Sequence, residues 1–468
     1  MPILSDRATN EAEPSLARRT ARFALSLRSE TFPAEIREKV GLCLLDYLSC
    51  CIGALKMPWA PALMRYLESR PSRPESFQWG LANAISAGDA AFGNGVLGHG
   101  LIREDMHVAS GNHIGVMVLP AMLALAEREH LAGRDLLAGI VAAYEVTARL
   151  GMANRAGVRN RHFRPSGISG AFGVTGGAIA ALGLDEMTAV NALAFAANSA
   201  CGLNEWAWSG GQDIYVHAGM AARNGINALD LARSGLVSSE RILEGADGMF
   251  AAYGSAEQGA AHLRNSFTAE RHLLGVRHKP YAGCNFIQTP VGAALVARQA
   301  GGFTVDEIEH VTIDTFASAR SYPGCDYVGP FSSVQQSKMS LQFAVAAAVV
   351  RGRVTEEEFA SLNDADIVAV ANKTSIALPP EFADAYPARQ PAAVKISLRT
   401  GRVLDGRLDD VAWLARDGVL ARFRTEAAPV FDKTFVAEIE EMAFSIDALD
   451  DASEFAGVLK QATLSCSS

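Results

Sequence analysis

The sequence has few charges, few aromatic side chains and no paired cysteine motif. Of its 468 residues, 20% are charged and 7% are aromatic, whereas 49% are hydrophobic. This composition excludes an intrinsically disordered chain, and the length predicts roughly two to three structural units. The formal net charge of −9 argues against a general nucleic-acid binder, whose domain would carry a basic excess.

Several motifs of known chemistry are missing. The chain has seven cysteines, but no two of them form a CxxC pair. This excludes a zinc knuckle and a thioredoxin motif, and it predicts reduced thiols. There is no GxxxxGK[ST] loop and no GxSxG elbow, and Gly170-x-x-Gly173 follows no predicted strand. The sequence therefore offers no nucleotide-binding fingerprint.

Signals for export or membrane insertion are also missing. Residues 1–19 are polar, with mixed charge, and have no apolar core of the signal-peptide type. The most apolar stretch, residues 114–126, is interrupted by Gly115 and Pro120 and is too short to span a bilayer. We expect a soluble, cytoplasmic protein that binds neither membranes nor nucleic acids.

The first part of the chain has the periodicity of helices. Apolar residues recur at three- and four-residue spacing. The predicted helices cover residues 16–27, 33–52, 59–68, 84–97, 115–129, 133–150, 166–182, 185–199 and 217–234. Glycines at 170, 173, 176 and 177 recur about one turn apart, each costing roughly 1 kcal/mol in helix propensity relative to alanine. Helices that accept this cost are expected to pack closely in a buried core.

The pattern changes after about residue 275. Residues 311–316 and 393–398 alternate and are β-branched, which is typical of strands. Residues 341–351 and 355–362 between them are predicted helices, and helical character returns at 431–449. The predicted fold is mainly α: a large, discontinuous, all-helical domain (1–274 and 410–468) with an inserted, smaller α+β domain (275–409).

The densest cluster of reactive side chains is the segment 98–115 (GHGLIREDMHVASGNHIG). It contains His99, Arg103, Glu104, Asp105, His107 and His113. Histidine titrates near neutrality and suits proton transfer. Two other interpretations remain open. His99 and Asp105 could have only structural roles, at a helix end and in a loop, or Asp105, His107 and His113 could bind a metal, although their spacing matches no standard ligand motif.

A second cluster, residues 155–166 (RAGVRNRHFRPS), leads into the glycine-rich helix. Pro165 and Ser166 are typical of a helix start, where backbone amides are unpaired. Arg164 lies beside that end, so the two features together could hold a carboxylate or a phosphate. The alternative is a solvated basic loop.

A third cluster, residues 277–284 (RHKPYAGC), lies at the predicted domain junction. Lys279, Tyr281 and Cys284 are candidate acids, bases or ligands, and domain junctions often contain clefts. Lys279 before a proline could equally be an exposed hinge residue. Nearby, residues 319–327 add Arg320 and Tyr322 as further candidates.

Taken in order, these segments resemble the signature of the MmgE/PrpD family. The resemblance rests on residues 89–95 (DAAFGNG), 99–113, 217–225 (HAGMAARNG), 243–245 (LEG), 279–284 (KPYAGC) and 337–343 (SKMSLQF). It implies a helical domain built from both chain ends, an inserted α+β lid, a homodimer and no organic cofactor. It also implies a site between the domains that holds polycarboxylates. The family includes 2-methylcitrate dehydratases, cis-aconitate decarboxylases and iminodisuccinate epimerases.

The resemblance also assigns site residues. His113 and Lys279 match the family histidine and lysine, and Asp105 matches the second residue of a paired acidic run in which Glu104 replaces the first. Tyr322 is a candidate for the lid tyrosine. Polar family positions are replaced by Ile102, Met106, Arg164 and Ile214. These replacements predict a less polar pocket, and a less anionic substrate, than in the tricarboxylate enzymes.

We therefore expect a cofactor-independent lyase that removes a proton next to a substrate carboxylate, with dehydration or a related elimination first. An epimerase or a decarboxylase is the alternative, and a non-catalytic carboxylate-binding protein is the alternative of another class. We expect His113 to be a base or acid and Lys279 an electrostatic stabiliser or acid. We expect His99, Asp105 and His107 to orient or relay. Expected substrate contacts are Arg103, Arg164, Arg320, Tyr281, Tyr322 and Cys284.

Overall fold

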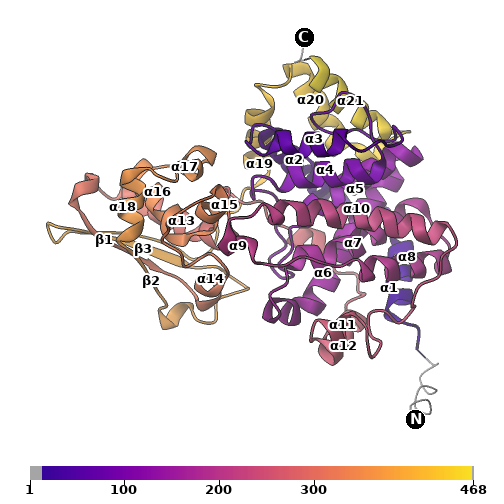
Figure 1. Ribbon diagram of the computed structural model, residues 1–468, viewed down its shortest axis with the longest axis horizontal. Coiled ribbons are helices and arrows are strands. Elements are labelled where there is room, and N and C mark those ends of the chain that lie inside the picture. Colours follow the sequence, from indigo (N-terminus) through magenta and orange to yellow (C-terminus); the bar gives the residue numbers. More distant parts are fainter. Residues whose placement is uncertain (1–12, 466–468) are drawn as a thin grey trace.

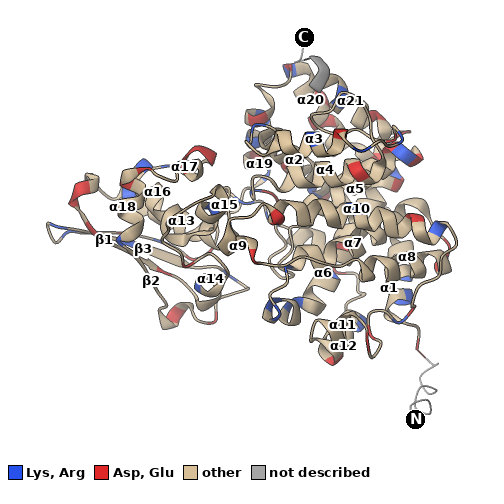
Figure 2. Cartoon of the chain, viewed as in Figure 1, with Lys and Arg blue, Asp and Glu red and all other residues tan. Residues whose placement is uncertain are grey.

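The computed structural model describes residues 13–465 and has two lobes (Figure 1). The larger lobe is helical and includes helices from both ends of the chain, while the smaller lobe contains the sheet. Acidic and basic residues are spread over both lobes (Figure 2). Among the residues discussed above, 1–12 and Cys466 lie outside the described range. The six cysteines within it are free thiols, as predicted.

The larger lobe and its edge comprise most of the helices. They are α1 (Leu16–Arg28), α2 (Ala34–Ala54), α3 (Ala60–Glu68), α4 (Ala87–His99), α5 (Gly115–Glu129), α6 (Gly133–Asn160), α7 (Pro165–Leu182), α8 (Glu186–Asn198), α9 (Trp206–Ser209), α10 (Asp213–Arg233), α11 (Met249–Ala252), α12 (Ala256–Asn265), α19 (Arg416–Ala427), α20 (Lys433–Phe444) and α21 (Ser453–Ser465). Local sequence sets their ends. The Ser15 side chain caps α1 by accepting the Arg18 amide, and α7 begins at Pro165, as predicted.

The smaller lobe is an α+β unit. It contains α13 (Gln288–Gln299), β1 (Ile308–Asp314), α14 (Ala317–Ser321), α15 (Val334–Met339), α16 (Leu341–Arg351), α17 (Glu356–Ala360), α18 (Ala365–Asn372), β2 (Thr374–Ala377), β3 (Ala392–Leu398) and β4 (Val403–Leu408). The strand order is β2-β1-β3-β4, with β1 parallel to β2 and antiparallel to β3. The predicted fold class, mainly α with a smaller α+β part, is confirmed.

The larger lobe is built from two separate parts of the chain. Helices α1–α12 and α19–α21 lie together, and the segment between them forms the lobe with the sheet (Figure 1). We propose that these lobes are the two domains, with boundaries near residues 275 and 409. The smaller lobe would then be an insertion in the helical domain.

Helix α6 is longer than the sequence suggested, because it continues ten residues past the predicted end at 150 to Asn160. Buried Ala153 and Val158 continue its apolar face. Gly157 allows close approach, because a Cβ there would lie 2.0 Å from the Tyr253 carbonyl oxygen. The start of the basic segment 155–166 is therefore helix rather than loop, and Arg155 and Arg159 lie one turn apart.

By length and composition alone, α6 could cross a membrane. However, 94% of its apolar window is buried inside the protein. The helices packed around α6, chiefly α7, account for this burial. This is the arrangement of a core helix in a soluble protein.

Close packing of α6 against α7 depends on glycine. A Cβ on Gly177 would lie 2.7 Å from the carbonyl oxygen of Gly139 and 2.8 Å from Met122 Sδ. The backbone oxygen cannot move away without disturbing α6. The predicted role of the glycine-rich helix in tight packing has this contact as its physical basis.

Replacing Gly177 by alanine should therefore destabilise the fold. We expect Gly177→Ala to lower the free energy of unfolding by about 1–3 kcal/mol, because the added methyl group overpacks the α6–α7 contact. Gly457→Ala in α21 is the matched control. Its Cβ would meet nothing within 4 Å, so stability should rise by up to about 1 kcal/mol from helix propensity. Urea denaturation measures both changes, and equal effects would contradict the packing argument.

Candidate active site

A cavity of about 80 Å³ lies where the two lobes meet. Its walls come from the loop after α4, the end of α6, the start of α7, the α9 region and the near edge of the α+β lobe. It is lined by Ile102, Met106, Gly111, His113, Arg155, Arg159, Phe163, Arg164, Pro165, Asn204, Trp206, Ile214, Cys284, Asn285, Phe286, Tyr322, Met339 and Tyr386. The lining is mostly apolar and has three arginines but no acidic residue.

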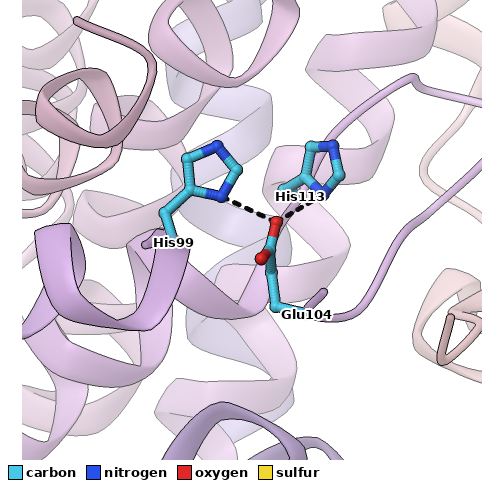
Figure 3. A group of neighbouring side chains, drawn as sticks. All are labelled: His99, Glu104 and His113. Carbon is cyan, nitrogen blue, oxygen red and sulfur yellow. Dashed lines mark ion pairs between the residues drawn. The ribbon is translucent and has the colours of Figure 1, made fainter. Parts of the chain in front are cut away.

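Behind this wall, one carboxylate is shared by two imidazoles (Figure 3). Glu104 Oε1 lies 2.6 Å from His99 Nδ1 and 2.8 Å from His113 Nδ1. His99 ends α4, Glu104 lies in the following loop and His113 comes just before α5. The backbone amide of His113 donates to Ser166 Oγ, which ties this residue to the start of α7.

Burial and neighbouring charge fix the protonation of this triad. Burial alone would raise the pKa of Glu104, but His99, Lys279 and His113 hold it well below its usual range. Burial lowers the pKa of His99 to about 3. Burial and the nearby Lys279 lower the pKa of His113 to about 4. At neutral pH the triad therefore has an ionised carboxylate and two neutral imidazoles.

Hydrogen-bond partners also determine where each imidazole proton lies. A carboxylate only accepts, so we assign the proton of each ring to Nδ1, the nitrogen beside Glu104, although neither close contact has the angles of a hydrogen bond. Arg164 Nη2, which can only donate, bonds His99 Nε2. His99 therefore has a hydrogen bond at Nε2 and a close contact with Glu104 at Nδ1. In the same tautomer, His113 keeps a lone pair on Nε2, on the opposite side of the ring from Glu104 (Figure 3).

Arg164 and Lys279 surround this triad. The Arg164 guanidinium donates to the Ile214 carbonyl oxygen at 2.7 Å and lies 5.7 Å from the Trp206 ring. It lines the cavity, as expected of a substrate contact. Lys279 is fully buried, and its Nζ donates to the carbonyl oxygens of Ile102 and Gly283 at 2.7 and 3.2 Å. Lys279 does not line the cavity and acts on the triad through its charge.

Asp105 anchors the helix that follows His113. Its carboxylate accepts the Gly115 amide at 3.0 Å, at the start of α5, and the Tyr144 hydroxyl at 2.6 Å. Burial raises the pKa of Asp105 to about 6. The structure thus places Asp105 beside the site as a support for α5, and not on the cavity wall.

His107 points elsewhere. Its Nδ1 accepts the Ser110 amide at 3.3 Å, and its ring lies 5.7 Å from that of His272. Both rings line a separate depression on the other side of the loop. The structure therefore does not bring Asp105, His107 and His113 together as metal ligands.

Within residues 13–465, the donors spaced for a metal are those of the triad, whose three ligand atoms lie within 4.8 Å of one another. Both imidazole Nδ1 atoms carry protons toward Glu104, and the cations of Arg164 and Lys279 lie close by. A second positive charge would be repelled there. These residues therefore fit a proton-transfer site better than a metal centre.

The other predicted substrate contacts divide into two groups. Tyr322 and Cys284 line the cavity, and Cys284 Sγ lies 3.7 Å from Cys325 Sγ. Arg103 is bound to Glu426 at 2.9 Å and lines a different depression together with Tyr281. Arg320 pairs with Asp326 at 2.8 Å on the surface and does not line the cavity.

Several residues of this wall were not predicted as site residues. Arg155 and Arg159 lie in the predicted basic cluster 155–166 but were not candidates themselves, and Asn204 and Trp206 lie outside every predicted cluster. The spacing of the two arginines could have identified them. They are four residues apart, and residues at that spacing lie on the same face of a helix once α6 is taken to continue to Asn160. Asn204 precedes α9 and Trp206 begins it, and a helix of four residues is too short to show a periodic pattern in the sequence.

Comparison with known proteins identifies the family of this chain. The MmgE/PrpD N-terminal domain matches residues 18–260 and the MmgE/PrpD C-terminal domain matches residues 281–447. The chain belongs to the MmgE/PrpD family. A cis-aconitate decarboxylase of Aspergillus terreus is 23% identical over 95% of this chain and 96% of its own length. The Mus musculus and Homo sapiens cis-aconitate decarboxylases are each 25% identical, over 85% and 79% of this chain and 83% and 79% of their own lengths.

The buried histidines should make the fold sensitive to acid. Between about pH 6.5 and pH 4, an unfolded chain protonates His99 and His113 but the folded chain does not. The unfolded state binds more protons there, so the free energy of unfolding should fall as the pH falls, by up to about 1.4 kcal/mol per pH unit for each group. Asp105, whose folded pKa is about 6, opposes this over part of the range.

Urea denaturation at several pH values measures this slope. His99→Asn and His113→Asn should each reduce the slope by up to about 1.4 kcal/mol per pH unit, which corresponds to one proton. A slope that is the same in both variants and in the parent protein would contradict the neutral, buried state of these rings.

Proposed function

We propose that this protein is a lyase that acts on a small carboxylate, with His113 removing a proton from the carbon next to the carboxylate group. The observation that carries the proposal is the His113 ring, which lines the cavity, is neutral at pH 7 and has its Nδ1 2.8 Å from Glu104, so that with the proton on Nδ1 the Nε2 lone pair is left for the cavity. A base with a carboxylate behind it is a common device for proton abstraction. The relatives are named cis-aconitate decarboxylases, and a decarboxylase is a kind of lyase.

In this mechanism, Arg164 stabilises the charge that develops on the substrate. Removing the proton shifts charge onto the substrate carboxylate, and a guanidinium in a dry cavity stabilises an anion strongly. Arg164 uses one donor on Ile214 and one on His99. Its remaining N–H groups can serve the substrate.

In an elimination, the electron pair left by the proton forms the double bond as a hydroxide departs. The hydroxide needs a proton to leave as water, and Tyr322 on the cavity wall can donate it. Burial raises the pKa of Tyr322, so this hydroxyl is protonated at neutral pH. Return of the proton to the opposite face would instead give epimerisation.

Decarboxylation is the second candidate, because the named relatives are cis-aconitate decarboxylases. The protonation state of His113 favours elimination, because loss of carbon dioxide needs a proton donor next, and this ring is neutral. Product analysis for water elimination against carbon dioxide release separates the two.

We also propose that the α+β lobe serves as a lid and that the protein is a cytoplasmic homodimer without an organic cofactor. These proposals rest on the family resemblance. The position of the cavity between the lobes supports the first of them.

The test is proton exchange in heavy water over a panel of mono-, di- and tricarboxylates. We expect the protein to exchange an α-proton of at least one of them, and His113→Asn to slow this exchange by about 10²–10⁴-fold, because the base is gone. His162→Asn, an exposed histidine outside the cavity, is the control and should exchange normally. An absence of exchange with every acid would support a purely binding protein and sink the lyase assignment.

Glu104 should act as a positioning residue. Glu104→Gln replaces the acceptor by an amide that can donate to Nδ1 and move the proton of His113 to Nε2, facing the cavity. We expect kcat to fall by about 10²–10⁴-fold with little change in KM, and Glu104→Asp to recover part of it. If both variants instead show a fall in kcat and an equal rise in KM, the substitutions have disrupted the whole site.

A further inference from the structure

Two arginines on the cavity wall have no carboxylate partner. Arg155 and Arg159 lie one turn apart near the end of α6, where basic residues gather in Figure 2. Both are partly buried, and both line the cavity. Within residues 13–465, neither forms an ion pair with an acidic side chain, and no acidic residue lines the cavity. Partly buried positive charge without a partner is costly unless an anion binds there.

The present contacts of these arginines leave donors unused. Arg155 donates to the carbonyl oxygens of Val108, at 3.0 Å, and of Ala109, and to the Tyr386 hydroxyl at 2.5 Å. Arg159 reaches Ser318 and Ser321 only at 3.4–3.5 Å, which is long for a hydrogen bond. A guanidinium has five N–H donors in a fork that matches a carboxylate. Arg159 is thus the less satisfied of the two.

The rest of the wall limits what can accompany that carboxylate. Ile102 and Ile214 are each 2% exposed, and Met339 is 1% exposed. A carboxylate against these side chains would lose its water without gaining a partner. An alkyl group, by contrast, would gain from the same contacts.

Two buried polar atoms complete the cavity. Trp206 Nε1 and Asn204 Oδ1 are buried without a hydrogen-bond partner, and both residues line it. Unpartnered buried polar atoms of this kind are commonly satisfied by a ligand or a water. The Trp206 N–H can donate to an oxygen of a bound carboxylate, and Asn204 Oδ1 can accept from a water bound beside it.

We propose that Arg155 and Arg159 form a second carboxylate subsite, and that the substrate is a compact dicarboxylate with a small alkyl substituent. One carboxylate lies beside the carbon that His113 deprotonates, near Arg164. The other is held by the arginine pair, and the alkyl group packs on Ile102 and Ile214. This inference rests on the proposed function for the placement of the first carboxylate.

Equilibrium binding by calorimetry tests the subsite without turnover. The probes are 2-methylsuccinate, 3-methylbutanoate, which lacks the second carboxylate, and propane-1,2,3-tricarboxylate. We expect 2-methylsuccinate to bind at least about tenfold more tightly than either of the others. Arg159→Gln should weaken the binding of 2-methylsuccinate by about 10–100-fold and change the affinity for 3-methylbutanoate by less than about twofold. Only 2-methylsuccinate has a second carboxylate for this arginine.

Arg320→Gln is the matched control, since Arg320 is an exposed arginine paired with Asp326 outside the cavity. It should change neither affinity. The subsite is overturned if Arg159→Gln weakens all probes equally or none, or if the tricarboxylate binds most tightly. Repeating the titrations in the His113→Asn variant separates the two proposals. If this variant loses proton exchange but still binds 2-methylsuccinate in a way that depends on Arg159, the subsite stands. If the parent protein exchanges protons but its binding of 2-methylsuccinate does not depend on Arg159, the proposed function stands and only the subsite is overturned.

Discussion

The site depends on a single buried carboxylate. One oxygen of Glu104 lies within 2.8 Å of both His99 Nδ1 and His113 Nδ1, and the charge of Lys279 helps to keep the carboxylate ionised. A buried charge without such partners would be protonated or would destabilise the fold. Because Glu104 stays charged, both imidazoles present their Nδ1 protons to it. One ring is then locked by Arg164, and the other is left with a free nitrogen for the cavity.

The scaffold brings these groups together from separate elements. The end of α4 provides His99, and the segment before α5 provides His113, while Asp105 holds the start of α5 through the Gly115 amide. Lys279 comes from the stretch that leads into the smaller lobe, and it is bound by carbonyls on both sides of the junction. The charge balance of the triad is therefore tied to how the two lobes meet.

Much of the fold could be predicted from the sequence, but only part of the site. Helical periodicity and two alternating segments indicated a mainly α protein with an α+β part. The strands β2 and β4 were missed, and both are short strands at the edges of the sheet. Helices α13, α19 and α21 were also missed, although α19 buries Val419, Phe423 and Ala427 at helical spacing. Arg103 was expected at the substrate, but it pairs with Glu426, more than three hundred positions away. Local spacing has no information about such a partner, nor about Glu104 lying between two rings.

The central claim is the protonation pattern of the triad, and ¹⁵N NMR of histidine-labelled protein at pH 7 tests it most directly. The account predicts that His99 and His113, assigned by their Asn variants, are both neutral, with the proton on Nδ1 and none on Nε2. An imidazolium, or a neutral His113 with its proton on Nε2, would contradict it. In either case the nitrogen facing the cavity would have no lone pair with which to take a proton.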